Sequence, residues 1–325
     1  MRAVVAAAVL ISVTTMAAFA ADEEPEHTRI VATTGMIADI VRNVGGKHVE
    51  VRQLLGAGVD PHLYKATRSD VSAMIDADAV FYNGLLLEGK MSDALVRIAT
   101  AGKPVFAVTE LIDESYLVAP DGAAGLHDPH VWMDARAWSK AIDVVRDRLS
   151  EIAPAHKATF RENADKFQSD IARLDAYVES IIASIPPERR ILITAHDAFH
   201  YFGKRYGIEV HGIQGISTES EAGLKAIEEL VGLIVEKKIP AIFGESTIST
   251  RSVEALVAGA KSKGHDVKIA GSLFSDAMGP PGTYEGTYIG MIDHNATTIA
   301  TALGGKTPAK GLNDRLAMGS AEGTK

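Results

Sequence analysis

The chain has 325 residues, 46% of them hydrophobic, and a formal net charge of -9. This length and apolar content allow a large buried core and indicate two domains, at roughly 150 residues per domain. They exclude a disordered or membrane-embedded chain, and the acidic balance disfavours nucleic acid as a partner.

Residues 1–20 have the pattern of a secretory signal peptide. Arg2 precedes an apolar run at 3–13, and Ala-Phe-Ala at 18–20 is a small–x–small cleavage site. The alternative is a buried or membrane helix, but the run is too short to span a bilayer. We therefore expect export of a soluble mature chain.

No cysteine occurs in the sequence. An exported protein without disulfides depends on its core for stability. Without an N-terminal cysteine there is no site for a lipid anchor, so we expect a protein that is free in a periplasm between two membranes. Any metal site must also be built from nitrogen and oxygen ligands.

The next part of the chain alternates between strand-like and helical patterns, and we assign residues 29–153 to an N-terminal lobe. The expected strands are 29–34, 49–55, 79–83 and 104–108, and the expected helices are 36–43, 68–75, 88–99 and 135–152. Such alternation predicts a parallel sheet with helices on both faces.

One long helix is predicted between Pro154 and Ile185. Apolar residues alternate at spacings of 4 and 3 and form a single stripe: Phe160, Ala164, Phe167, Ile171, Leu174, Val178, Ile181 and Ile185. The helix would be about 48 Å long at 1.5 Å per residue, so we assign residues 154–186 to a rigid strut. The alternative, a two-stranded coiled coil, is disfavoured by the mixture of alanine and phenylalanine in the stripe.

A second alternating block, residues 187–304, is assigned to a C-terminal lobe. Its expected strands are 190–195, 208–214, 241–244 and 267–270, and its expected helices are 198–206, 221–236, 252–262 and 284–303. Residues 305–325 are expected to form a loose tail. The predicted fold class is therefore α/β, with two lobes, each a mostly parallel sheet flanked by helices, joined by one long rigid helix.

The tripeptide Asp-Pro-His occurs twice, at 60–62 and 128–130. Proline fixes its own backbone and keeps the preceding Asp extended, so His62 and His130 are each presented from a rigid turn. Both copies precede helical patterns, at the edge where open α/β sheets bind ligands. The alternative is a pair of unrelated surface turns.

The C-terminal lobe offers two comparable positions, because His196 and Asp276 each follow an apolar strand. A cleft between the lobes would bring all four side chains together. Three imidazoles and one carboxylate suit tetrahedral Zn²⁺, and a bidentate Asp admits Mn²⁺ or Fe²⁺. Calcium and magnesium are disfavoured because they prefer oxygen ligands.

Motifs along nearly the whole chain resemble those of the metal-binding (zinc/manganese) solute-binding proteins of bacterial ABC importers, cluster A-I type. These motifs are TTGMIAD at 33–39, GVDPHLY at 58–64, YNG at 82–84, DPHVWMD at 128–134, TAHDAF at 194–199, LFSDAMG at 273–279 and GTYIGM at 286–291.

This resemblance implies two α/β lobes joined by a long helix, a metal between the lobes and a membrane permease as partner. Carried over by motif, the metal ligands are His62, His130, His196 and Asp276. The third ligand position, residue 196, is a histidine, and the segment before His130 is short. Both features resemble the mixed zinc/manganese type. The metal is therefore expected to be Zn²⁺ or Mn²⁺, with Fe²⁺ admitted.

Three further residues are left open as helpers of the site. His127 precedes the second motif, although a solvated loop position is the simpler interpretation. His200 lies one helical turn after His196. Glu245 ends an expected strand and would hold a ligating histidine in one tautomer.

Two alternatives belong to other classes of protein, a zinc-dependent hydrolase and a metal-stabilised adhesin. Catalytic zinc keeps an open position, whereas here a protein group supplies the fourth ligand, and neither a His-Glu-x-x-His run nor a Gly-x-Ser-x-Gly elbow occurs. We therefore predict a monomeric periplasmic binding protein without catalytic activity. Its metal binding should weaken below about pH 6, because ligating histidines must be neutral.

Overall fold

The computed structural model describes residues 27–119 and 126–316. The expected signal peptide at 1–20 lies outside the described residues. Within the described part, no helix is both long and apolar enough to cross a membrane.

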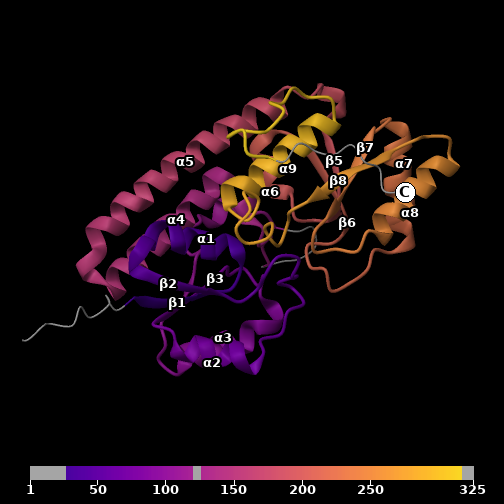
Figure 1. The fold of residues 1–325 in the computed structure, drawn as a ribbon. Helices are drawn as coiled ribbons and strands as arrows, with labels where there is room; N and C mark the ends of the chain where they lie inside the picture. Colours follow the sequence, from indigo (N-terminus) through magenta and orange to yellow (C-terminus); the bar gives the residue numbers. More distant parts are fainter. Residues whose placement is uncertain (1–26, 120–125, 317–325) are drawn as a thin grey trace, which may run out of the picture.

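A four-stranded parallel sheet forms the centre of the N-terminal lobe (Figure 1). Its strands lie in the order β2-β1-β3-β4, with bounds β1 Thr28–Ala32, β2 Val49–Gln53, β3 Ala79–Tyr82 and β4 Val105–Ala107. The helices are α1 Gly35–Gly45, α2 Arg68–Asp76, α3 Ser92–Thr100 and α4 Ala135–Ile152.

Successive residues of the central strands serve two different cores, as the two-residue period of a strand requires. Ile30 and Phe81 pack with α1 and α4, whereas Val31 and Val80 pack with α2 and α3 on the other face. The expected arrangement of helices on both faces of a parallel sheet is confirmed.

The long helix α5 runs from Lys157 to Ala183, and its 27 residues span about 40 Å. A short 3-10 turn, Pro154–His156, precedes it. Figure 1 shows α5 extending along both lobes, and it contacts α1 and α4 in one lobe and α6 and α9 in the other. Its apolar stripe, including Phe160 and Leu174, is buried in a core to which both lobes contribute.

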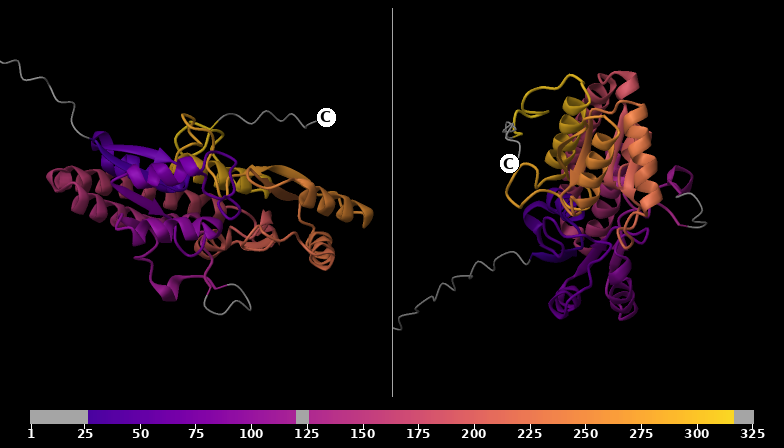
Figure 2. Two further views of the ribbon diagram at one scale, coloured as in Figure 1. Left: turned by 90° about the horizontal axis from the view of Figure 1, so that it is seen from below. Right: turned by 90° about the vertical axis from the view of Figure 1, so that its right-hand side faces the viewer.

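The C-terminal lobe contains two parallel strand pairs, β5–β6 and β7–β8, with β5 beside β7. The strand bounds are β5 Ile191–His196, β6 Glu209–Gln214, β7 Ala241–Glu245 and β8 Lys268–Leu273. The helices are α6 His200–Tyr206, α7 Leu224–Glu236, α8 Arg251–Ser262 and α9 Tyr288–Ala302. The left view of Figure 2 shows the two lobes side by side, the N-terminal lobe in indigo to magenta and the strands and helices of the C-terminal lobe in orange.

Two expectations for the C-terminal region were wrong. The last helix begins at Tyr288 rather than at residue 284, because Thr287 is extended and its hydroxyl accepts the N–H of Gly290. Residues 305–316 are not loose: the N–H of Leu312 donates to the carboxylate of Asp293, and Leu316 is buried. Residues 317–325 lie outside the described part of the chain.

Candidate metal centre

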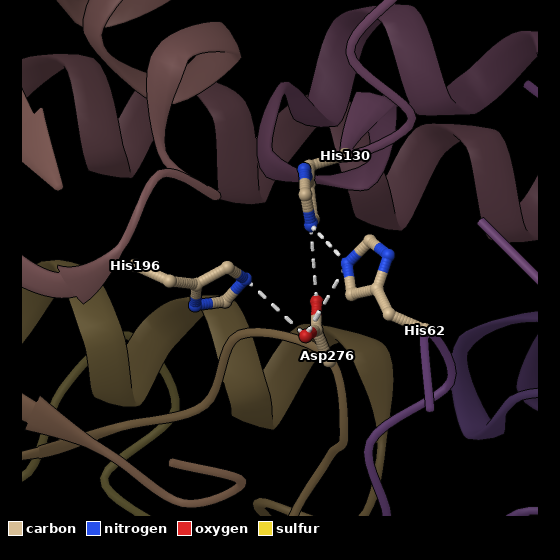
Figure 3. A group of neighbouring side chains, drawn as sticks. All are labelled: His62, His130, His196 and Asp276. Carbon is tan, nitrogen blue, oxygen red and sulfur yellow. Dashed lines mark hydrogen bonds and ion pairs between the residues drawn. The ribbon is translucent and has the colours of Figure 1, made fainter. Parts of the chain in front are cut away.

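The four predicted ligands come from four different segments, two in each lobe. His62 lies in the turn after β2, and His130 lies immediately before a 3-10 turn, Val131–Met133. His196 is the last residue of β5, and Asp276 follows the end of β8. Figure 3 shows the four side chains directed toward one another.

The structure brings one nitrogen or oxygen atom of each residue to within 4.8 Å of all the others. The Nε2 atoms of His130 and His196 are each 3.2 Å from a different oxygen of Asp276. The Nε2 atom of His62 is 3.3 Å from Nε2 of His130 and 3.7 Å from Asp276. All four residues are buried.

Both Asp-Pro-His turns use the same local hydrogen bond. Oδ1 of Asp60 accepts the N–H of His62 at 2.8 Å, and Oδ1 of Asp128 accepts the N–H of His130 at 2.9 Å. Such Asp side-chain bonds to the backbone two residues on stabilise a turn. The rigid presentation expected from the sequence therefore has a specific cause in each copy.

Two buried carboxylates orient two of the imidazoles. Asp128 contacts Nδ1 of His130 at 2.7 Å, and Glu245 contacts Nδ1 of His196 at 2.5 Å. Because a carboxylate accepts the proton on Nδ1, Nε2 is the ring nitrogen that each histidine turns toward Asp276 and can offer to a metal ion. Glu245, at the end of β7, thus orients the ring of His196.

The carboxylates also set the charge that the centre favours. Burial lowers the pKa of His130, but Asp128 and Asp276 outweigh it and raise that pKa to about 9. His196 behaves in the same way: burial opposes Glu245 and Asp276, which raise its pKa. Burial lowers the pKa of His62 to about 4. The carboxylates therefore favour positive charge on His130 and His196, whereas burial favours the neutral form of His62.

Three buried atoms at the centre have no hydrogen-bond partner among the described residues: Nε2 of His196 and both carboxylate oxygens of Asp276. Buried polar atoms are normally satisfied, and an unpaired group costs about 1–3 kcal/mol. A cation between them would satisfy all three atoms. Three imidazole nitrogens with one carboxylate suit Zn²⁺, Mn²⁺ or Fe²⁺ and disfavour Ca²⁺.

The remaining histidines lie outside this group. His127 lines a surface cavity beside His62, and its Nε2 is 3.9 Å from Glu114. His200 lies between two carboxylates, 3.3 Å from Asp128 and 3.2 Å from Asp197. His200 therefore supports Asp128, the partner of His130.

Two cross-lobe contacts near the centre had no signal in the sequence. The indole N–H of Trp132 donates to the carbonyl of Ser275, next to Asp276, at 2.9 Å. The hydroxyl of Thr218 donates to Oδ2 of Asp60 at 2.6 Å. Their partners lie 143 and 158 residues away in the chain, beyond the reach of local patterns.

Comparison with known proteins finds a matching family and close relatives along most of the chain. Residues 30–302 match the family described as "Zinc-uptake complex component A periplasmic". The manganese-binding lipoprotein MntA of Bacillus subtilis is 49% identical over 278 residues, covering 86% of this chain and 90% of the relative.

Two solved structures have the same fold. The periplasmic zinc-binding protein TroA of Treponema pallidum has a TM-score of 0.83 at 45% identity, covering 85% of this chain and 99% of that one. The Fe(III)-bound YtgA of Chlamydia trachomatis has a TM-score of 0.78 at 26% identity, covering 86% and 98%.

Proposed function

The chain belongs to the family of periplasmic A components of zinc-uptake complexes, and we propose that it captures a divalent transition metal in the periplasm and delivers it to an ABC-type membrane importer. The relatives named for manganese and zinc support a transition-metal cargo. The membrane permease of the importer is the partner that this function requires.

We propose His62, His130, His196 and Asp276 as the ligands of the transported ion. The observation that carries this assignment is the convergence of one buried nitrogen or oxygen atom from each of the four residues, two from each lobe. Among the described residues, Nε2 of His196 and both oxygens of Asp276 have no hydrogen-bond partner. A transported ion bound between the lobes is removed from water and held by groups that each lobe contributes. Release then requires that at least one of these ligands withdraw.

No catalytic role is part of this proposal. A hydrolase would need an open metal position and a nearby base, whereas the four groups here surround the centre and both neighbouring carboxylates are bound to histidine rings. A metal-stabilised adhesin would bind the ion without delivering it. Uptake by cells with and without the permease separates these two roles.

We propose a periplasmic monomer without a lipid anchor. The relative from Bacillus subtilis is named a lipoprotein, whereas this sequence has no cysteine to which a lipid could be attached. Membrane and soluble fractions of cells that produce the protein test the point: recovery in the membrane fraction would contradict it.

Zinc should bind more tightly than manganese, because the affinity of a given nitrogen and oxygen site follows the Irving–Williams order. Elemental analysis of protein purified without chelator, followed by competition calorimetry with the two metals, measures this directly. We expect about one equivalent of transition metal per chain. An equal concentration of zinc should replace manganese in the site. Tighter binding of manganese than of zinc would contradict the donor set proposed here.

Metal binding should release protons and weaken as the pH falls. At about pH 7 a histidine with a pKa of about 9 carries an extra proton, which the metal must displace. The apparent affinity should then fall about tenfold per pH unit for each displaced proton, starting above the pH of 6 expected from ordinary histidines. Calorimetry in buffers of different ionisation enthalpy measures the release, and a pH-independent affinity would contradict the prediction.

A further inference from the structure

His62 differs from the other two imidazole ligands. His130 and His196 each have a carboxylate at Nδ1, but within residues 27–119 and 126–316 no carboxylate contacts Nδ1 of His62. In Figure 3 this second ring nitrogen points away from Asp276. His62 is also the most exposed of the four residues, at 5%. It is therefore the ligand that is held least firmly through its ring.

His62 borders a surface cavity of about 340 Å³, which both lobes line. The N-terminal lobe contributes Leu86 and His127, and the C-terminal lobe contributes Ile216, Ser217 and Glu219. The C-terminal wall belongs to residues 215–223, the segment that connects β6 with α7 and that we name the crossover loop. This cavity offers a route between His62 and solvent. Asp276 borders a separate cavity of about 650 Å³.

Two bonds join the crossover loop to the opposite lobe beside His62. The hydroxyl of Thr218, which is 9% exposed, donates to Oδ2 of Asp60 at 2.6 Å. The carboxylate of Glu219 pairs with Lys90 at 2.5 Å, and both of these side chains are partly exposed. The other oxygen of Asp60 accepts the N–H of His62. Asp60 alone therefore connects the hydroxyl of Thr218 with the backbone of His62.

We propose that the crossover loop is a latch: Thr218 and Glu219 position the turn that carries His62 and thereby control how fast the metal leaves. This inference rests on the function proposed above. When the two bonds break, the turn at residues 60–62 can move without a change in the other three ligands. Release would then need a local loop movement, and α5, packed against both lobes, would not have to bend.

Thr218→Val removes the hydroxyl and keeps the shape of the side chain. We expect zinc to dissociate about tenfold faster, because a buried hydrogen bond to a carboxylate is lost. Stopped-flow transfer of zinc to a chromophoric chelator measures the rate. Thr218→Ser should restore the slow rate, because serine keeps the donor. Thr250→Val is a matched control. It removes the bond from the Thr250 hydroxyl to the Glu254 carboxylate, which lies within the C-terminal lobe, and should leave the rate unchanged.

The ion pair gives an independent test, because Lys90→Met and Glu219→Gln each break it. The latch predicts that both substitutions speed dissociation, by about twofold, since the pair is partly exposed and screened by salt. If these charges acted only by attracting or repelling the metal, the two substitutions would change the rate in opposite directions.

The outcomes separate the latch from the function on which it depends. Wild-type protein that binds no transition metal would overturn the proposed function and the latch together. Wild-type protein that binds zinc, with an unchanged dissociation rate in Thr218→Val, would overturn the latch alone. Opposite effects of Lys90→Met and Glu219→Gln would also overturn it.

Discussion

Asp276→Asn is expected to lower the affinity for zinc by more than about 100-fold. Even carboxylates that only orient a metal ligand change affinity by about 10–100-fold, and Asp276 contributes the anionic group of the centre itself. Its two oxygens lie 3.2 Å from His130 and His196 and have no other partner in the described chain. An amide keeps the volume but removes the charge and one acceptor oxygen.

Competition with a chelator of known affinity measures this loss. Asp293→Asn is a matched control, because Asp293 is a second buried carboxylate of the same lobe, bonded to Tyr284 and Leu312 rather than directed at the centre. The control should lower the free energy of unfolding without a large change in zinc affinity. An affinity of Asp276→Asn within about threefold of wild type, less than 1 kcal/mol, would show that Asp276 is not a ligand.

Leu174→Ala is expected to lower the free energy of unfolding of the metal-free protein by about 2–5 kcal/mol. Leu174 lies on the buried stripe of α5, is completely buried, and belongs to the core that both lobes share. Truncation leaves a cavity beside α5, which packs against both lobes. The substitution should therefore destabilise both lobes together, although it changes none of the four residues of the metal centre.

Urea denaturation followed by tryptophan fluorescence and by circular dichroism tests this expectation. Both tryptophans, Trp132 and Trp138, lie in the N-terminal lobe, whereas circular dichroism reports on the helices of both lobes. The two signals should shift together. Leu224→Ala is the control, since this leucine is 72% exposed and its loss should cost less than about 0.5 kcal/mol. Separate transitions in Leu174→Ala would contradict a shared core.

Local patterns predicted the helices well where capping and breaking residues agree with the apolar period. The helix expected at 135–152 has these bounds in the structure, because Asp134 caps its first turn and Pro154 follows its end. The helix expected from 284 begins late because an extended Thr287 caps it, and Gly290 passes so close to Tyr284 that a side chain could not fit. Such packing between neighbours has no periodic signal.

The site shows the same division between local and distant information. The two Asp-Pro-His turns are local, so the sequence could place His62 and His130 on rigid turns. It could not show that Asp128 faces the ring of its own histidine while Asp60 faces Thr218, because that difference depends on the opposite lobe. The unequal support of the two histidines, and with it the latch, became visible only in three dimensions.

Anomalous diffraction from crystals of the zinc-loaded protein, recorded at the zinc absorption edge, tests the central claim most directly. We predict one strong peak between the lobes, about 2.0–2.2 Å from Nε2 of each of the three histidines and from the carboxylate of Asp276. A peak elsewhere, or a bound ion from which any of these four side chains turns away, would contradict the account.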